Sequence, residues 1–330
     1  MTGPAGRPTI FSTNEIHPRA VELLAPAAEF VVASSPTREA ILAEAGTADV
    51  IIVRAPLPPA LFDAAPRLRA AIRHGAGLDM IPIDDATRAG VLVANVPAVN
   101  APTVAEHVVM AILALLRRFR MVDRDLRRDG WFAGRSHADH GHDLSGKRLG
   151  IVGMGNVGRA VHRMTQGFGL SVSATTRSTG NLPDGVAGAE LVTLLETSDV
   201  VVLCCPLTPQ TRGLISRERI AQMKPGALLV NVSRGAVVDE ETLIEALRDG
   251  HLGGAALDVF ADQPLDPQSP LFSFDNVILT PHMAGITEES MQRMGEGAAR
   301  EALRVLSGGL PENLRNPEVV ARYRERFPPG

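Results

Sequence analysis

Three glycines with the spacing G-x-G-x-x-G, Gly153, Gly155 and Gly158, follow a short apolar run of the chain. This spacing is typical of a turn that holds the pyrophosphate of a dinucleotide. The first glycine permits a tight turn, the second lets the backbone approach the phosphates, and the third lets a helix lie close to a strand. The alternative is a glycine-rich turn in another kind of α/β protein, because the motif alone is weak evidence.

The segments around the glycines favour the dinucleotide site. Leu149–Val152 has the length of a buried strand, a helical pattern continues to about Gln166, and Leu170–Thr175 is expected to be a second strand. The N-terminus of the helix would offer its unpaired N–H groups to the phosphates. This is the strand, turn, helix and strand context that the motif requires.

The end of the second strand bears on the choice of cofactor. NAD-binding units usually carry Asp or Glu about 20 residues after the glycines, whereas this chain has Thr176, Arg177 and Ser178 there. A guanidinium can pair with a 2′-phosphate, and the two hydroxyls can donate hydrogen bonds to it. We therefore expect a preference for NADP(H). A solvated surface arginine, beside a site that also accepts NAD, is the alternative.

The composition is that of an ordinary globular chain. Its 330 residues are 45% hydrophobic and 21% charged, and this length suggests two domains. The formal net charge of −4 indicates no surface for nucleic acid or membranes, and no apolar stretch approaches the about 20 residues of a membrane span. The adjacent Cys204 and Cys205 are expected to be buried thiols rather than a disulfide. With no signal-peptide pattern, we expect a cytoplasmic protein.

Apolar runs alternate with helical segments from Thr9 to about Pro97, which predicts a parallel sheet covered on both faces. Strands are expected over 9–12, 29–33, 49–53, 68–73 and 91–94, with helices near 19–24, 37–44, 60–64 and 82–89. The turn His74–Gly77 ends one of these strands, where open α/β sheets bind ligands, and its glycines would let N–H groups converge on an anion. A simple tight turn explains it equally well.

Two features are expected in the segment that follows. Thr103 and Glu106 have the spacing of a capping box, with Thr103 as the N-cap of a helix that starts near the domain boundary. The three arginines between 117 and 120 suit the C-terminus of this helix better than an anion site.

Residues Trp131–Asp143 are expected to form a polar loop. Its histidines lack accompanying thiolates, so a mobile loop or a subunit contact is favoured over a metal site.

The chain beyond the glycine turn continues as strand and helix units. Together with the opening unit, strands expected over 198–206, 226–235, 253–260 and 276–281 make a doubly wound sheet of about six strands. A long helix is predicted from Ser290 to Leu306. The residues after it have no domain of their own, so we expect them to return and cover the first domain.

Polar residues stand at the ends of three successive strands in this second half. They are Arg234, the segment from Asp258 to Gln263, and His282. Each alone has an ordinary explanation, as a surface charge, a turn cap or a loop histidine. Because substrate and cofactor meet at the carboxyl ends of the strands in this architecture, their placement favours one shared site.

The chain carries a set of motifs that resembles the D-isomer-specific 2-hydroxyacid dehydrogenases, which include D-lactate, glycerate/hydroxypyruvate, phosphoglycerate and formate dehydrogenases. The matching segments are Gly75–Ile81, Asn95–His107, Gly150–Gly158, Cys205–Ile215, Asn231–Glu240, Ala256–Phe260 and Leu279–Gly285. The resemblance implies two doubly wound parallel-sheet domains. A Rossmann dinucleotide-binding domain (103–290) would be inserted in a flavodoxin-like substrate domain (1–102 and 291–330), and the protein would be a homodimer.

The resemblance also implies the roles of individual residues. Arg234 should bind the substrate carboxylate, His282 should be the general acid and base, and Asp258 should contact the nicotinamide carboxamide. Further residues are implied at the substrate, namely Arg54, Gly75, Ala76, Gly77 and Asn100. Those implied at the cofactor are Gly153, Gly155, Asn156, Val157, Gly158, Thr176, Arg177, Ser178, Pro206, Thr211, Val232, Ser233, Asp258, His282 and Gly285. The reaction implied is hydride transfer between NAD(P)H and a small 2-keto or D-2-hydroxy acid.

One position departs from the usual pattern of the family. Most members have Glu before the proline of the segment that pairs with the catalytic histidine, and this chain has Gln263. Formate dehydrogenases carry Gln there, and their substrate-site Asn resembles Asn100. A formate dehydrogenase is therefore one alternative, although the GAGLD turn and the missing carboxylate at Thr176 argue against it. A nicotinamide-sensing binding protein is another, against which Arg234 and His282 favour an enzyme.

Overall fold

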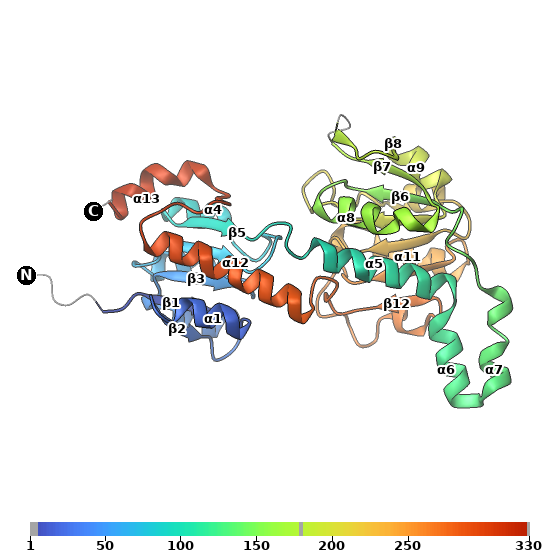
Figure 1. The fold of residues 1–330 in the computed structure, drawn as a ribbon, viewed down its shortest axis with the longest axis horizontal. Coiled ribbons are helices and arrows are strands. Elements are labelled where there is room, and N and C mark those ends of the chain that lie inside the picture. The colour runs from blue at the N-terminus through green and yellow to red at the C-terminus, as the bar shows by residue number, and fades with distance from the viewer. Residues whose placement is uncertain (1–5, 178–180, 329–330) are drawn as a thin grey trace, which may run out of the picture. The chain divides into compact units, whose positions relative to one another are not determined.

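The computed structural model describes residues 6–177 and 181–328, and the chain forms two compact units (Figure 1). The first unit comprises residues 1–100 and 287–330, and the second comprises residues 101–286. The boundaries predicted from the sequence, 102/103 and 290/291, lie a few residues from these. Among the helices of the described residues, none combines the length and the apolar composition needed to cross a bilayer.

The first unit contains a five-stranded parallel sheet with the order β2-β1-β3-β4-β5, which is the flavodoxin-like order. Its strands are β1 (Thr9–Ser12), β2 (Glu29–Val32), β3 (Val50–Val53), β4 (Ala70–Arg73) and β5 (Leu92–Asn95). Its helices are α1 (Pro18–Leu24), α2 (Arg38–Glu44), α3 (Leu61–Ala64), α4 (Ile83–Arg88), α12 (Glu288–Leu306) and α13 (Val320–Arg326). These elements agree with the alternation predicted from the sequence.

Alternate residues of the first sheet enter two different cores, because side chains of a strand point to opposite faces. Val50 and Ile52 face a cluster that includes residues of α1, α12 and α13, whereas Ile51 and Val53 face residues of α2, α3 and α4. Val319 and Tyr323 complete the first cluster, so the end of the chain packs against the first sheet.

The second unit contains a seven-stranded parallel sheet with the order β12-β11-β10-β9-β6-β7-β8. Its strands are β6 (Arg148–Val152), β7 (Ser171–Thr175), β8 (Val186–Gly188), β9 (Val200–Leu203), β10 (Leu228–Asn231), β11 (Gly254–Leu257) and β12 (Val277–Leu279). The sequence predicts about six of them. It misses β8, because this edge strand has only three residues and two of them are exposed.

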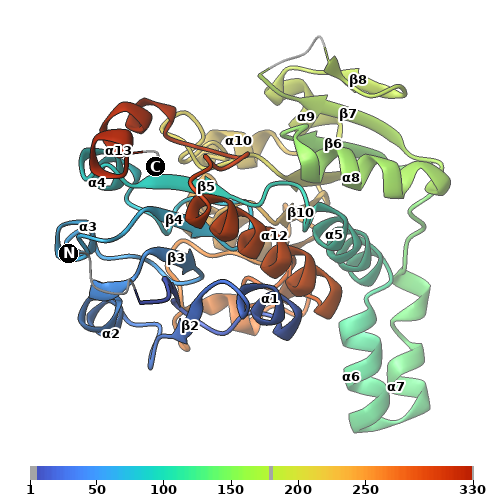
Figure 2. The same cartoon turned by 60° about the vertical axis from the view of Figure 1, so that its left-hand side comes forward.

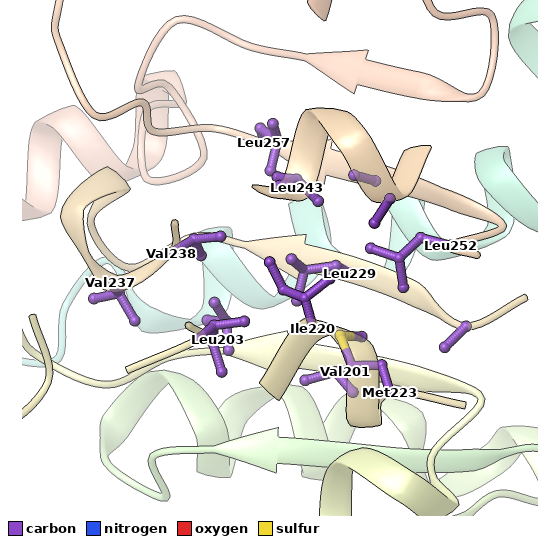
Figure 3. Close-up of a cluster of buried hydrophobic side chains, with 14 of the residues drawn as sticks. Val201, Leu203, Ile220, Met223, Leu229, Val237, Val238, Leu243, Leu252 and Leu257 are labelled. Carbon is purple, nitrogen blue, oxygen red and sulfur yellow. The ribbon is translucent and has the colours of Figure 1, made fainter. Parts of the chain in front are cut away.

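Helices cover both faces of the second sheet. They are α5 (Ala101–Leu116), α8 (Asn156–Thr165), α9 (Leu191–Thr197), α10 (Arg217–Gln222) and α11 (Glu240–Arg248). Val201 and Leu203 of β9 enter a cluster with residues of α9, α10 and α11 (Figure 3), whereas Val200 and Val202 face residues of α5 and α8. The strand ends of this sheet are thereby fixed in place by two apolar layers.

Two sequence predictions for this unit are wrong. Helix α5 begins at Ala101, so Thr103 lies inside the first turn and is not the N-cap. Pro102 explains the earlier start, because a proline has no N–H to leave unpaired in the first turn of a helix. The segment predicted as the polar loop 131–143 is partly helical, with α7 (Trp131–Arg135) lying against α6 (Phe119–Asp129).

The two helices α6 and α7 form a hairpin that projects from the second unit (Figure 2). Gly134 allows them to approach, because a Cβ there would lie 2.7 Å from the Cβ of Leu126. His137, which follows α7, contacts Asp125 of α6 through Nε2 at 2.7 Å. The part of the chain that the structure describes contains no group of three potential metal ligands.

Candidate active site

The glycine turn follows β6 at the place where the strand order of the second sheet reverses, between β6 and β9. Open α/β sheets bind their ligands in this crevice. Gly153 has a φ of +99°, and a Cβ there would lie 2.8 Å from the Cα of Cys205, which follows β9. A Cβ on Gly158 would clash with the carbonyl oxygen of Gly153. The close approach of these backbone segments therefore requires glycine at both positions.

The second glycine of the motif leaves space for a ligand. Gly155 is the N-cap of α8, and among the described residues, its own chain neighbours apart, no atom lies within 4 Å of the place of its Cβ. The N–H groups of Asn156, Val157 and Gly158 have no acceptor among the residues that the structure describes. Free N–H groups at a helix N-terminus, facing open space, fit a pyrophosphate. These residues would hold the phosphates of a dinucleotide cofactor.

The residues expected to select the cofactor follow the end of β7, next to the glycine turn. The N–H of Gly153 donates to the carbonyl of Thr175, the last residue of β7, at 2.9 Å. Thr176 is half-buried and Arg177 is exposed. Within the described ranges, Arg177 has no ion-pair partner, so its charge is available to a ligand. The third residue of this prediction, Ser178, lies outside the described residues.

The polar residues of the three strand ends lie along one edge of the second sheet. Arg234 follows β10, Asp258 follows β11 and His282 follows β12, and these strands are parallel neighbours. Gln263 extends from the segment after β11, and its Oε1 lies 3.1 Å from Nδ1 of His282. Gln263 and His282 are therefore in contact.

This contact assigns the tautomer of the histidine ring. An amide oxygen only accepts hydrogen bonds, so Nδ1 of His282 carries a hydrogen and donates it to Gln263. Nε2 is the ring nitrogen that Gln263 does not contact, and an imidazole held through one nitrogen can act as a general acid and base through the other.

The carboxylate of Asp258 holds the segment that carries His282. Asp258 is 2% exposed and accepts hydrogen bonds from Thr280 Oγ1 at 2.7 Å, from the Met283 N–H at 2.8 Å and from the Ala284 N–H at 2.9 Å. Its own carbonyl accepts from the His282 N–H at 2.8 Å. His282 has a φ of 55°, which an L-residue seldom adopts. These bonds sustain that conformation, a positioning role that the sequence does not reveal.

His107 of α5 is a further residue of this neighbourhood that the sequence does not single out. Its Nε2 lies 3.4 Å from Thr280 Oγ1. Burial lowers the pKa of His107, while the charge of Asp258 acts in the opposite direction. The neutral ring therefore supports the threonine that donates to Asp258.

Arg234 is placed by a close approach of two backbone segments. A Cβ on Gly235 would clash with the carbonyl of Phe260, so only glycine lets residues 233–235 lie against the segment that leads to Gln263. Nη1 of Arg234 donates to the carbonyl of Ser233 at 2.6 Å, and Nδ2 of Asn231 donates to the carbonyl of Arg234 at 3.2 Å. Arg234 as a whole is half-buried at this end of the strands.

The other residues expected at the cofactor lie in the segments after β9, β10 and β12. Thr211 Oγ1 donates to the carbonyl of Pro206 at 2.6 Å and closes the loop after β9. Val232 and Ser233 follow β10, and the hydroxyl of Ser233 donates to Oδ1 of Asn231 at 2.7 Å. Gly285 follows the residues held by Asp258. All of them belong to the second unit.

The further residues expected at the substrate, apart from Arg234, belong to the first unit. Arg54 follows β3 beside β1, where the strand order of the first sheet reverses, and its side chain donates to the carbonyl of Glu15. Burial lowers the pKa of Arg54. The turn with Gly75, Ala76 and Gly77 follows β4, and Asn100 lies half-buried beyond β5.

His74 begins this turn, and its side chain is nearly enclosed. It is 2% exposed, and its Nε2 has no hydrogen-bond partner among the described residues. Burial, together with the charges of Arg54 and Arg73, lowers its pKa to about 3. The ring is therefore neutral near neutral pH.

Comparisons with known proteins show the family of this chain. The profile of the family described as D-isomer specific 2-hydroxyacid dehydrogenase, NAD binding domain, matches residues 109–284. The chain is 36% identical over 323 residues to a glyoxylate reductase of Korarchaeum cryptofilum, covering 95% of this chain and 97% of that protein. The chain belongs to the D-isomer-specific 2-hydroxyacid dehydrogenase family. It is therefore an NAD(P)-dependent oxidoreductase that transfers hydride between a nicotinamide cofactor and a 2-keto or D-2-hydroxy acid.

Solved structures extend the comparison of this dehydrogenase. An NADPH-dependent glyoxylate/hydroxypyruvate reductase of Sinorhizobium meliloti, in complex with NADP and malonate, superposes with a TM-score of 0.85 at 30% identity, covering 95% of this chain and 98% of that one. A formate dehydrogenase of Granulicella M. superposes with a TM-score of 0.80 at 28% identity, covering 89% and 81%. Both support the two parallel-sheet domains predicted from the sequence.

Proposed function

We propose that this dehydrogenase reduces a small 2-keto acid of the glyoxylate and hydroxypyruvate class, with NADPH as the preferred hydride donor. The observation that carries the proposal is the imidazole of His282, held by Gln263 at 3.1 Å at the same sheet edge as Arg234. A cation and a general acid at one edge suit a substrate that combines a carboxylate with a carbonyl.

Each residue has a defined task in this proposal. Arg234 binds the carboxylate of the keto acid through its planar fork and polarises the neighbouring carbonyl. Nε2 of His282 protonates the carbonyl oxygen as hydride arrives at the carbon, and it takes the proton back in the reverse reaction. Gln263 accepts the Nδ1 hydrogen and so orients the ring, and Nε2 is the atom that exchanges the proton. Bound at Gly155 and the N-terminus of α8, the nicotinamide cofactor supplies the hydride.

The preference for NADPH rests on Thr176 and Arg177. Where an NAD site usually has a carboxylate that would repel a 2′-phosphate, this chain offers a hydroxyl and an exposed guanidinium beside the glycine turn. Charge-assisted hydrogen bonds from arginine to phosphate are among the strong ones. NAD is the alternative cofactor.

The turn after β4 and the residues Arg54 and Asn100 are proposed to complete the substrate site. The N–H groups of Ala76 and Gly77 have no acceptor among the described residues, and consecutive free N–H groups of a turn suit a carboxylate. Arg54 adds a positive charge at the position where the first sheet reverses its strand order.

A formate dehydrogenase is the second candidate, because Gln263 stands where most family members have Glu. Formate oxidation releases carbon dioxide and needs no proton relay, so a neutral partner of the histidine would suffice. Two features of the sequence argue against this candidate. Arg177 has no neighbouring carboxylate, and the chain carries the GAGLD turn of the 2-hydroxyacid dehydrogenases.

We further propose that the protein is a cytoplasmic homodimer whose subunits meet through the α6–α7 hairpin. Three aromatic side chains on the hairpin are exposed, with Phe119 at 61%, Trp131 at 69% and Phe132 at 87%. Aromatic residues gathered on one projecting element are costly to leave in water and are enriched at subunit interfaces. A second copy of this chain offers the same surface, as a two-fold axis requires.

A substrate and cofactor panel tests the proposal. The wild-type enzyme is assayed with glyoxylate, hydroxypyruvate and formate, each with NADP(H) and NAD(H). We expect the highest kcat/KM for NADPH with one of the two keto acids. Turnover of formate alone would favour the second candidate, and NADPH binding without turnover of any acid would favour a nicotinamide-sensing protein.

A further inference from the structure

The turn after β4 has every carbonyl held by the protein. The carbonyls of His74 and Gly77 accept from Arg73, through Nη1 at 2.6 Å and Nε at 3.0 Å. The carbonyl of Gly75 accepts from the Val96 N–H at 2.9 Å. The carbonyl of Ala76 accepts from Nδ2 of Asn95 at 2.6 Å. The four carbonyls are therefore fixed by donors of β4, β5 and the residue after β5.

Fixing the carbonyls also fixes the N–H groups of the turn, because both belong to rigid peptide planes. The peptide between Ala76 and Gly77 shows this most directly. Its carbonyl receives Asn95, while its N–H group, on Gly77, has no acceptor within the described ranges. Gly75 has a φ of +129°, which permits the turn to reverse at this point. Asn95 thus controls the direction of a free N–H group.

The orientation of Asn95 is in turn set by Arg315. Asn95 is 4% exposed, and its Oδ1 accepts from Nε of Arg315 at 2.7 Å. A guanidinium can only donate, so it must face the oxygen of the amide, and the NH2 group must face Ala76. The reverse orientation would place two donors together and two acceptors together.

Arg315 is itself held against β5. Its N–H donates to the carbonyl of Val93 at 2.8 Å, and Leu314 forms an antiparallel bridge with Ala94. Next to it, Asn316 accepts from the Val93 N–H at 2.8 Å. The returning end of the chain therefore provides an ordered donor to Asn95 from a position 220 residues away in the sequence.

We infer that Asn95 and Arg315 are positioning residues for the substrate carboxylate, acting through the peptide of Ala76 and Gly77. The inference rests on the proposed function, in which this turn binds the carboxylate of a keto acid. It adds a specific relay: Arg315 orients Asn95, Asn95 holds the Ala76 carbonyl, and the Gly77 N–H then points at the substrate. Neither residue touches the substrate.

The test is the substitution Asn95→Asp. Aspartate has the same shape and still accepts from Arg315, but it cannot donate to the Ala76 carbonyl. We expect KM for the keto acid to rise about tenfold or more, as for the loss of one hydrogen bond, with a smaller change in kcat and an unchanged KM for NADPH. Arg315→Ala should raise the same KM, and Arg315→Lys, which keeps one donor, should raise it less.

Asn316→Asp is the matched control, because it alters the same junction of β5 and the chain end without contacting the turn. It should lower the melting temperature and leave KM for the keto acid unchanged. An unchanged KM in Asn95→Asp, or equal increases in Asn95→Asp and Asn316→Asp, would overturn the inference while wild-type turnover upholds the proposed function. If the wild type reduces no keto acid, the proposed function fails and the inference fails with it.

Discussion

The amide oxygen of Gln263 lies 3.1 Å from Nδ1 of His282, so the ring proposed to exchange the proton is oriented by a neutral group. A carboxylate at this position would stabilise the imidazolium form. For Gln263→Glu we expect the pH–rate profile of keto-acid reduction to move to higher pH by about one unit, because the protonated ring is the form that reduces. An identical profile would separate Gln263 from His282. Gln268→Glu, on the same exposed segment, is the control for an added charge.

Cofactor preference is expected to depend on Arg177. Arg177→Ala removes the guanidinium proposed to bind the 2′-phosphate, so kcat/KM for NADPH should fall about tenfold or more, while the value for NADH stays nearly constant. The measurement is the ratio of the two kcat/KM values. Arg163→Ala, which removes an exposed arginine of α8, should not change the ratio. A wild-type preference for NADH would contradict the assignment.

The exposed aromatic residues of the hairpin predict the oligomeric state. The wild type should sediment as a dimer, and Phe132→Asp should sediment as a monomer with an unchanged far-UV circular dichroism spectrum. Placing a charge in an apolar subunit contact is costly, which gives the expected direction. Phe272→Asp, at a side chain that is 51% exposed outside the hairpin, should remain dimeric. A monomeric wild type would contradict the proposed surface.

His74 predicts a loss of stability in acid. Its folded-state pKa of about 3 lies below the ordinary value of 6.5. Between these two pH values, His74 is protonated in the unfolded chain and neutral in the folded chain. The contribution of His74 to the free energy of unfolding is therefore fully present above pH 6.5. It decreases by up to about 1.4 kcal/mol per pH unit as the pH falls toward 3. Denaturant unfolding at pH 7 and pH 5 measures this difference.

His74→Gln should reduce the difference in unfolding free energy between the two pH values, because glutamine does not titrate. His140→Gln, at an exposed histidine, should leave it as in the wild type. If His74→Gln retains the full acid dependence, other groups account for it.

The buried strands of both sheets can be predicted from the sequence, because buried parallel strands appear as short apolar runs. The polar residues after three of these strands can be located for the same reason, since each follows the end of such a run. It misplaces the start of α5 at Thr103, where the capping-box spacing occurs inside a helix that Pro102 begins. The polar composition of 131–143 conceals α7, which packs against α6.

The supporting contacts of the site are harder to predict from the sequence. The bond between Arg315 and Asn95 depends on the register between β5 and a segment without regular structure, and no local pattern encodes it. The carboxylate of Asp258 turns toward the residues after β12, which follows from the pairing of β11 with β12 rather than from its own neighbours in the chain.

The most direct test of the account is the reduction of glyoxylate by NADPH in the wild type and in His282→Ala, with NADPH affinity measured by fluorescence in both. General acid catalysis accounts for about 10²–10⁴-fold in rate, so kcat should fall by that order while the Kd for NADPH stays within about threefold of the wild type. Equal losses of kcat and of NADPH affinity, or an unchanged kcat, would contradict the role of His282 as the acid and base.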